Sequence, residues 1–238
     1  MSSIDIMNKR EEEMAELILL LSEKSKSFTE PNMVVIGGYA LRAFIPFSRY
    51  SRDCDFVMKE CMDIINGWKP EGVEVETFER KNGYGYMRWT KIFEIGKKKA
   101  KLGIDFMEGL VKGREGEAFE IDEKFLANSK KVKINIGNKV CEIFVPSYTD
   151  FFILKVMSAR KSDIRDIAAL VWKNGVPDVK GRLDALSDET IFLRNLKGKI
   201  IPEMENKFFL SSWRGMFITQ EFREDDKKSV IDSLSSLL

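Results

Sequence analysis

The amino-acid sequence predicts an α+β protein, in which a mixed, twisted sheet flanked by helices is followed by a helical C-terminal half. Two observations favour this fold class. Short apolar runs with period-two alternation recur through the first 145 residues, whereas helical spacing of apolar residues dominates after Pro146. With 44% hydrophobic residues, the 238-residue chain can fill a core. The predicted domains are therefore residues 1–145 and residues 146–238.

The first elements are a helix, a strand and a second helix. Residues 5–27 carry an apolar stripe beside a charged run, which predicts an amphipathic packing helix. Residues 33–36 are apolar and predict a short buried strand. Gly37 and Gly38 then turn the chain into a short helix, which Pro46 stops.

Residues 53–58 predict a strand with two chemically different faces. Apolar side chains alternate onto one face, while Asp53 and Asp55, at i and i+2, share the other. Two neighbouring carboxylates repel each other unless a cation lies between them. The pair therefore predicts a divalent metal site.

Residues 100–107 repeat this pattern, because Asp105 lies on the face opposite the strand's apolar residues and Gly103 beside it leaves room for a ligand. If the two strands are neighbours, Asp105 joins Asp53 and Asp55 in one cleft. Mg²⁺ prefers oxygen ligands and fills its remaining positions with water and substrate phosphate. Two such ions can hold the attacking and leaving oxygens of a phosphoryl displacement.

The sequence patterns in the rest of the first domain predict strands, turns and short helices. The expected elements are a helix at 60–68, strands at 73–78 and 86–95 around an Asn82-Gly83 turn, a solvated turn at 97–99, a loop with a short helix at 109–128, and a hairpin of 131–136 with 139–145.

The second domain is expected to be helical throughout. Ser147 followed by Asp150 indicates a capping box at the start of its first helix. The expected helical segments are 147–161, 162–175, 178–196 and 221–237.

Composition excludes several classes of chemistry. The chain has no histidine, which removes Ser-His-Asp and Cys-His catalysis and nearly every zinc site. Lys and Arg number 39 against 38 Asp and Glu, so no global field draws the protein to nucleic acid or membrane. Three cysteines, Cys54, Cys61 and Cys141, form no CxxC pair, and no apolar run spans a bilayer. We therefore expect a cytoplasmic protein with no membrane partner.

One ordered motif connects these features to a known family. In chain order it consists of Gly37 and Gly38, a helix, Arg49, Ser51, Asp53 and Asp55, and the later strand aspartate Asp105. This motif resembles the nucleotidyltransferase superfamily of the DNA polymerase beta type. The resemblance implies a nucleotidyltransferase fold and a catalytic domain over residues 1–145. It also implies that the glycines cradle a triphosphate, that Arg49 and Ser51 contribute to nucleotide binding, that the paired aspartates bind metals and that Asp105 activates the attacking hydroxyl.

A second segment, residues 154–170, is similar to the K...R.K..D..D segment of the AbiEii-type toxin and antibiotic-modifying branches. This similarity implies that Lys155 faces the nucleotide and that the following basic residues contact phosphates. The alternative is a solvated helix face with local charge pairs, such as Arg160 with Asp163.

The function predicted from these features is an Mg²⁺-dependent nucleotidyltransferase, with Mn²⁺ as the alternative ion. It would move a nucleoside monophosphate from an NTP such as ATP to the end of a tRNA or other RNA, a protein or a small molecule. Two alternatives stay open. One is a non-catalytic nucleotide-binding or partner-binding module, as in a toxin–antitoxin pair with a cognate antitoxin. The other is a carboxylate-dependent phosphodiesterase.

Overall fold

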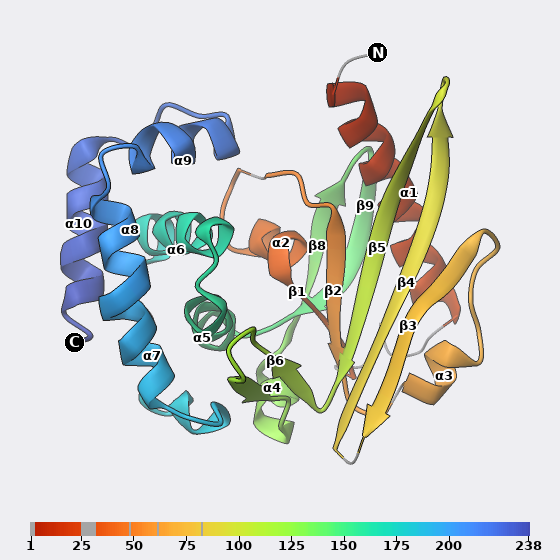
Figure 1. Ribbon diagram of the computed structural model, residues 1–238, viewed down its shortest axis with the longest axis horizontal. Coiled ribbons are helices and arrows are strands. Elements are labelled where there is room, and N and C mark those ends of the chain that lie inside the picture. Colours follow the sequence, from red (N-terminus) through yellow and green to blue (C-terminus); the bar gives the residue numbers. More distant parts are fainter. Residues whose placement is uncertain (1–2, 25–31, 48, 61, 82) are drawn as a thin grey trace. The chain divides into compact units, whose positions relative to one another are not determined.

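A five-stranded mixed sheet is the framework of the N-terminal half of the protein (Figure 1). The structure is a computed structural model that describes residues 3–24, 32–47, 49–60, 62–81 and 83–238. The strand order in the sheet is β1-β2-β5-β4-β3. In chain order the strands are β1 (Met33–Ile36), β2 (Asp53–Met58), β3 (Val73–Lys81), β4 (Tyr84–Ile95) and β5 (Lys98–Glu108).

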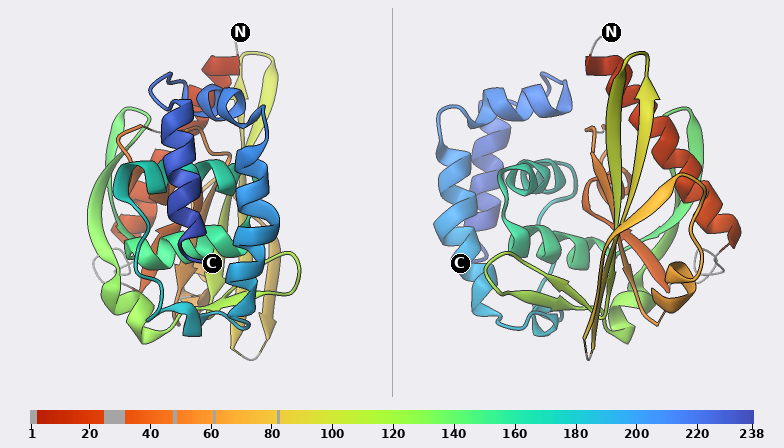
Figure 2. Two further views of the ribbon diagram at one scale, coloured as in Figure 1. Left: turned by 90° about the vertical axis from the view of Figure 1, so that its left-hand side faces the viewer. Right: turned by 45° about the vertical axis from the view of Figure 1, so that its right-hand side comes forward.

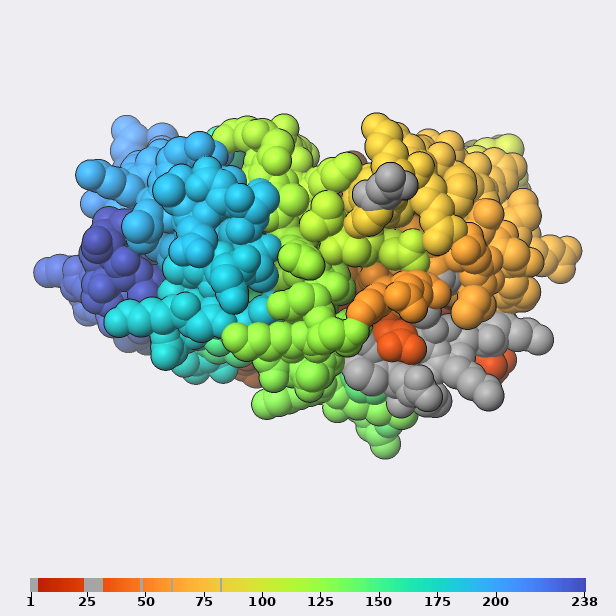
Figure 3. Space-filling model, turned by 90° about the horizontal axis from the view of Figure 1, so that it is seen from below, coloured from red at the N-terminus to blue at the C-terminus, as the bar shows by residue number. Residues whose placement is uncertain are grey.

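Strands β2 and β5 form a parallel pair, whereas the other neighbouring pairs in this sheet are antiparallel. Between them the chain passes through α3 (Met62–Asn66) and the β3–β4 hairpin, which returns β5 beside β2 in the same direction. The rings of Phe56 on β2 and Phe106 on β5 stack with centroids 5.5 Å apart in the core. Strand β3 is an edge strand, and its region of the chain, in orange and yellow, is at the surface in Figure 3.

Helix α1 (Ser3–Lys24) packs against β5 and against the hairpin of β8 (Lys130–Ile136) and β9 (Lys139–Val145), as Figure 2 shows. Leu17 and Leu21 of its apolar stripe are buried, so the amphipathic pattern has the packing role expected of it. The other short elements before residue 130 are α2 (Gly37–Ala40), the 3₁₀ turn η2 (Leu41–Ala43), α4 (Glu123–Asn128), and the strands β6 (Leu110–Lys112) and β7 (Ala118–Glu120), which pair with each other.

The chain divides into two compact units. The first consists of Met1–Ala43, Tyr50–Val111 and Ile121–Pro146, and the second of Phe44–Arg49, Lys112–Glu120 and Ser147–Leu238. The main break therefore falls between Pro146 and Ser147, and two short segments from earlier in the chain belong to the helical unit. The division into domains 1–145 and 146–238 stays a prediction.

The second unit is built from helices around an aromatic core. Trp213 lies at its centre, with ring centroids 4.5 Å from Phe222, 4.6 Å from Phe217 and 5.7 Å from Phe47. Its helices are α5 (Tyr148–Ser158), α6 (Lys161–Asn174), the 3₁₀ turn η3 (Leu183–Ala185), α7 (Thr190–Asn195), the π-helical turn η4 (Leu196–Ile200), α8 (Ile201–Glu205), α9 (Phe209–Phe217) and α10 (Glu224–Ser235).

The predicted fold class is confirmed: a mixed sheet with flanking helices precedes a helical C-terminal half. Three local predictions are wrong. Lys98 and Lys99 belong to β5 and not to a turn, because the β4–β5 hairpin turns at Gly96 and Lys97. The expected loop at 109–128 contains the paired strands β6 and β7 before its helix. Residues 178–189 form turns and the 3₁₀ turn η3 instead of a helix.

Some predictions fall on parts of the chain that the structure leaves undescribed. Residues 25–27 of the first predicted helix, Asn82 of the predicted hairpin turn and Cys61 lie outside the described residues. Gly83 is described, and its φ of +73° suits the predicted turn. None of the helices in the described part of the chain has both the length and the apolar character that a membrane span needs.

Candidate functional site

The three predicted carboxylates come from two adjacent strands of the sheet. In the parallel pairing of β2 with β5, Asp55 lies directly opposite Asp105, and Asp53 lies opposite Gly103. Side chains at alternate positions of a strand share a face, so Asp53 and Asp55 lie on the same face as Asp105. The sequence-based expectation that the two strands are neighbours is therefore confirmed.

Gly37, where β1 ends and α2 begins, lies against Asp55. Its φ is +69°, a conformation that favours glycine. A Cβ atom at this position would lie 2.1 Å from Oδ2 of Asp55, so any side chain would displace the carboxylate. Gly38 follows as a buried residue of α2. Gly37 thus lets the backbone approach the Asp55 carboxylate closely.

Gly103 has a similar role on β5. A Cβ atom there would lie 2.5 Å from Oδ1 of Asp53 and 2.6 Å from Nη2 of Arg88. The glycine therefore provides the space in which the Asp53 carboxylate and the Arg88 guanidinium meet.

Two residues of β4, Tyr86 and Arg88, complete the site. The Tyr86 hydroxyl donates to Oδ1 of Asp105 over 2.8 Å. Nη1 of Arg88 donates to both oxygens of Asp105, at 3.0 Å and 2.9 Å, and Nη2 donates to Oδ1 of Asp53 at 2.9 Å. The Arg88 guanidinium thus joins two of the three carboxylates.

The electrostatic environment follows from burial and from these contacts. Burial raises the pKa of Asp105 above its ordinary value, although the hydrogen bond from Tyr86 and the charge of Arg88 oppose the shift. Burial, with the hydrogen bond to Asp105, raises the pKa of Tyr86 to about 12, so its hydroxyl is a donor at neutral pH. Burial lowers the pKa of Arg88, but the neighbouring carboxylates outweigh it and hold the value above the ordinary one.

Sequence reasoning missed Tyr86 and Arg88, yet a signal for them existed. The β4–β5 hairpin pairs Ile95 with Lys98, and counting seven residues outward along each strand pairs Arg88 with Asp105. An arginine placed opposite an aspartate in a hairpin is a favourable cross-strand pair. A turn that included all three lysines at 97–99 would shift this register and would not place Arg88 opposite Asp105.

Ser51 lies just before β2 and interacts with the backbone. Its hydroxyl donates to the carbonyl oxygen of Asp53 over 2.9 Å, which fixes the chain where it enters the strand. Its predicted contact with a nucleotide stays a prediction.

Arg49 and Lys155 belong to the second unit, where they form a buried charge network. Nζ of Lys155 lies 2.8 Å from a carboxylate oxygen of Asp163 and 2.8 Å from one of Asp166. Arg49 makes a two-pronged pair with Asp166, with Nε and Nη2 each 2.7 Å from an oxygen. Lys155 is 4% exposed, so it is not part of a solvated helix face.

The local pair of Arg160 with Asp163, expected under the alternative reading, is present at 2.7 Å. It joins the same network, because Asp163 also contacts Lys155. Burial alone would raise the pKa of Asp163, but the charges of Lys155 and Arg160 lower it below its ordinary value. These contacts make the network a structural feature of the α5–α6 pair.

The carboxylate site contains the oxygen ligands that Mg²⁺ takes, because three aspartates meet on neighbouring strands. In the part of the chain that the structure describes, no group of three or more His, Cys, Asp and Glu side chains is arranged to hold a metal ion. Arg88 uses oxygens of Asp53 and Asp105 that such an ion would need. The residues therefore fit a divalent ion by ligand type, and access of the ion to them depends on Arg88.

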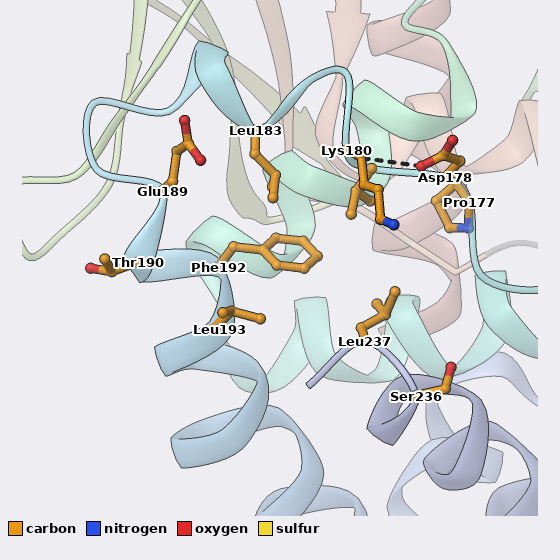
Figure 4. Close-up of a pocket in the computed structure, with 11 residues that line it drawn as sticks. Pro177, Asp178, Lys180, Leu183, Glu189, Thr190, Phe192, Leu193, Ser236 and Leu237 are labelled. Atoms are coloured by element: carbon orange, nitrogen blue, oxygen red, sulfur yellow. Dashed lines mark hydrogen bonds between the residues drawn. The ribbon is translucent and has the colours of Figure 1, made fainter.

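The second unit also contains a pocket of about 460 Å³, shown in Figure 4. Phe192, Leu183, Leu193 and Leu237 give it a largely apolar lining, and the backbone nitrogen of Lys180 donates to Asp178 at one side. None of the predicted site residues lines this pocket.

Comparisons with known proteins give structural similarities alone. No protein-family model matches the chain, and no curated protein matches it. The chain is similar to a crystal structure named "putative nucleotidyltransferase from H. pylori", with a TM-score of 0.47 and 12% identity over 100% of this chain and 99% of that one. It is also similar to JHP933 from Helicobacter pylori, with a TM-score of 0.41 and 11% identity over 92% and 90% of the two chains. Both TM-scores are low, and neither similarity is evidence for the function of this chain.

Proposed function

We propose that this protein is a divalent-metal-dependent nucleotidyltransferase, which moves a nucleoside monophosphate from an NTP to a hydroxyl acceptor and releases pyrophosphate. The observation that carries the proposal is the register that sets Asp105 beside Asp55, with Asp53 two residues away on the same face. Carboxylates gathered in this way suit phosphoryl transfer, because the reaction needs oxygen ligands for metal ions that neutralise phosphate charge. The ordered resemblance of the glycine and aspartate motifs supports the same class.

In this proposal Asp53, Asp55 and Asp105 would hold Mg²⁺ or Mn²⁺, which would supply Lewis-acid stabilisation of phosphate charge when bound. Asp105 accepts the proton of the attacking hydroxyl. Burial raises its pKa, which makes its carboxylate a better proton acceptor than an ordinary exposed aspartate. Gly37 and Gly38 present backbone N–H groups to the triphosphate, a role supported by the close approach of backbone and carboxylate at Gly37.

Arg49, Ser51 and Lys155 have less support as nucleotide-binding residues. Each is engaged by another part of the protein: Arg49 and Lys155 by buried aspartates, and Ser51 by the backbone of Asp53. The proposal does not depend on them.

The test is transfer of label from each α-labelled NTP in the presence of Mg²⁺ and a crude cell extract. Asp53→Asn and Asp105→Asn should each abolish labelling, because each removes one charged ligand while keeping the size of the side chain. Asp63→Asn is the matched control, since this aspartate on α3 is 73% exposed. Undiminished labelling by the two site variants contradicts the proposal.

The same assay identifies the acceptor. Label in the RNA fraction, the protein fraction or the small-molecule fraction separates a tRNA or RNA end from a protein side chain and from a small molecule. A cognate antitoxin, as the toxin branch implies, is tested by asking whether a protein from the extract binds the chain and suppresses labelling.

A non-catalytic nucleotide-binding module is a second candidate, and one observation favours it. Arg88 already neutralises Asp53 and Asp105 within the protein. Carboxylates whose charges are balanced by Arg88 can keep this arrangement without a metal ion. Calorimetry that shows NTP binding independent of Mg²⁺, together with no turnover, would establish this candidate over the enzyme.

A further inference from the structure

Arg88 occupies the centre of the carboxylate site. Its guanidinium donates to both oxygens of Asp105 and to one oxygen of Asp53, at 2.9–3.0 Å. Its Nε also lies 3.3 Å from Oε2 of Glu76 on β3. Three carboxylates from three strands therefore surround one positive side chain.

The position of Arg88 is fixed by the sheet, not by chance contact of long side chains. Arg88 lies directly opposite Asp105 in the β4–β5 ladder, and Asp105 lies opposite Asp55 in the β5–β2 ladder. The side chains of Arg88 and Asp105 are 27% and 13% exposed, so their pairing is partly shielded from solvent. Charge-assisted pairs of this geometry are among the stronger interactions at a protein surface.

We propose that Arg88 is the counter-ion of the carboxylate site and a positioning residue that competes with a divalent cation for Asp53 and Asp105. This inference rests on the proposed function, because it concerns how the same carboxylates are loaded with metal. It goes beyond that function by assigning a role to a residue outside the aspartate and glycine motifs.

The competition follows from shared acceptor sites and from charge. Oδ1 of Asp105 accepts from both Tyr86 and Arg88, and Oδ2 accepts from Arg88, so a cation that coordinates this carboxylate shares Oδ2 with the guanidinium and lies next to its positive charge. Repulsion between the guanidinium and a divalent ion acts in the same direction.

The structure provides a partner for the withdrawn guanidinium. Oε2 of Glu76 already contacts Arg88 Nε, while Oε1 accepts from Lys101 at 2.7 Å, so Glu76 can retain the guanidinium through Oε2 after Asp53 and Asp105 are released. An incoming triphosphate gives the same guanidinium a second anionic partner. The site should therefore take up a metal ion weakly by itself and more strongly together with an NTP.

The test measures binding of Mn²⁺ alone, by electron paramagnetic resonance titration of the free ion, to the full-length protein and three variants. Arg88→Gln removes the competing charge and should tighten Mn²⁺ binding by about tenfold or more, the order of change that one unit charge produces at close range. Arg88→Lys keeps the charge but cannot hold both carboxylates, and should tighten binding by a smaller factor.

Lys91→Gln is the matched control. Lys91 lies three residues further along β4, and its Nζ pairs with Glu13 of α1 at 2.6 Å. Its loss removes one positive charge from the same strand and should change Mn²⁺ affinity by less than about twofold.

Mn²⁺ binding by Arg88→Gln and Arg88→Lys that is no tighter than that of the natural protein would overturn the proposal, as would equal tightening by Lys91→Gln. If Arg88→Gln does not fold, Arg88→Lys decides alone. Because no NTP or acceptor is present, this outcome is separate from that of the labelling assay: the protein can fail to transfer nucleotides and still show the competition, or transfer them and not show it.

Discussion

At the scale of single residues, Gly37 is the position of the site where a substitution should be most harmful. It combines a φ of +69° with a neighbouring Asp55 oxygen only 2.1 Å from where a Cβ atom would be. The positive φ makes any side chain at this position destabilising. The short distance means that a side chain would also displace Asp55, a proposed metal ligand. Gly72 shares the first property, with φ +74°, but has nothing within 4 Å of an added Cβ.

These two glycines allow the two effects to be separated. Gly72→Ala should cost about 1–2 kcal/mol of unfolding free energy, the usual penalty of a left-handed conformation for alanine. Gly37→Ala should cost more, because Asp55 must also move, and it should weaken Mn²⁺ binding whereas Gly72→Ala should not. Urea unfolding and the Mn²⁺ titration measure both effects. Equal behaviour of the two variants would show that the contact with Asp55 is unimportant.

At the scale of elements, the network of Lys155, Asp163 and Asp166 joins α5 to α6. Lys155→Met should lower the free energy of unfolding by about 3–5 kcal/mol, because it leaves two buried carboxylates without one of their partners. Thermal and urea unfolding measure the loss. Lys199→Met is the control: Lys199 pairs with the exposed Glu115, and its replacement should have little effect.

The same variant distinguishes a structural from a nucleotide-binding Lys155. A protein that keeps its stability but loses NTP affinity would support the role implied by the AbiEii-type resemblance. A large loss of stability would instead show that Lys155 has a structural role, through its ion pairs with aspartates of α6.

Acidic pH should weaken the same pair of helices. The pKa of Asp163 in the folded protein lies below its ordinary value of 3.8, because Lys155 and Arg160 outweigh the effect of burial. Its stabilising contribution is therefore complete above pH 3.8 and is lost as the pH falls from there toward the folded pKa. Unfolding free energy should fall more steeply below about pH 4 for the natural protein than for Asp163→Asn. Parallel slopes would contradict this.

Much of the sheet and half of the site were predictable because they depend on short-range patterns. Alternation along 53–58 and 100–107 set the face of each aspartate, and the carboxylates themselves indicated a cation. Arg88 was missed since its significance lies in a pairing across the β4–β5 hairpin. The pairing of Lys155 with Asp163 was not predictable, because burial of a lysine depends on which acidic residues a second helix brings to it.

At the scale of the whole molecule, the two units share the chain in an interrupted order. Residues 44–49 belong to the helical unit although about a hundred residues of sequence separate them from α5. Phe47 accounts for this, since its ring lies 5.1–5.9 Å from those of Phe217, Trp213 and Trp172. No local sequence pattern around Phe47 indicates these contacts, so the sequence predicts a single domain boundary, at residue 146.

Phe47 should therefore stabilise a unit that lies almost wholly beyond residue 146. Phe47→Ala should cost about 2–4 kcal/mol, as expected for removing a ring from an aromatic cluster. Phe208→Ala should change stability by less than about 0.5 kcal/mol, because that ring is 64% exposed. Tryptophan fluorescence during urea unfolding reports on this unit through Trp172 and Trp213, once Trp68 and Trp89 of the first unit are replaced by Phe in all the proteins compared. Equal losses from the two variants would rule out this role for Phe47.

The parallel pairing of β2 with β5 has a consequence for the protein while it is being made. Asp53 and Asp55 leave the ribosome about fifty residues before Asp105, which corresponds to roughly 3–10 s of synthesis. During that interval β1 can already pair with one edge of β2, but the edge that β5 later covers is open. Charged side chains discourage an open strand edge from joining another chain. We therefore expect the two aspartates to protect the nascent strand from aggregation before they can serve in any reaction.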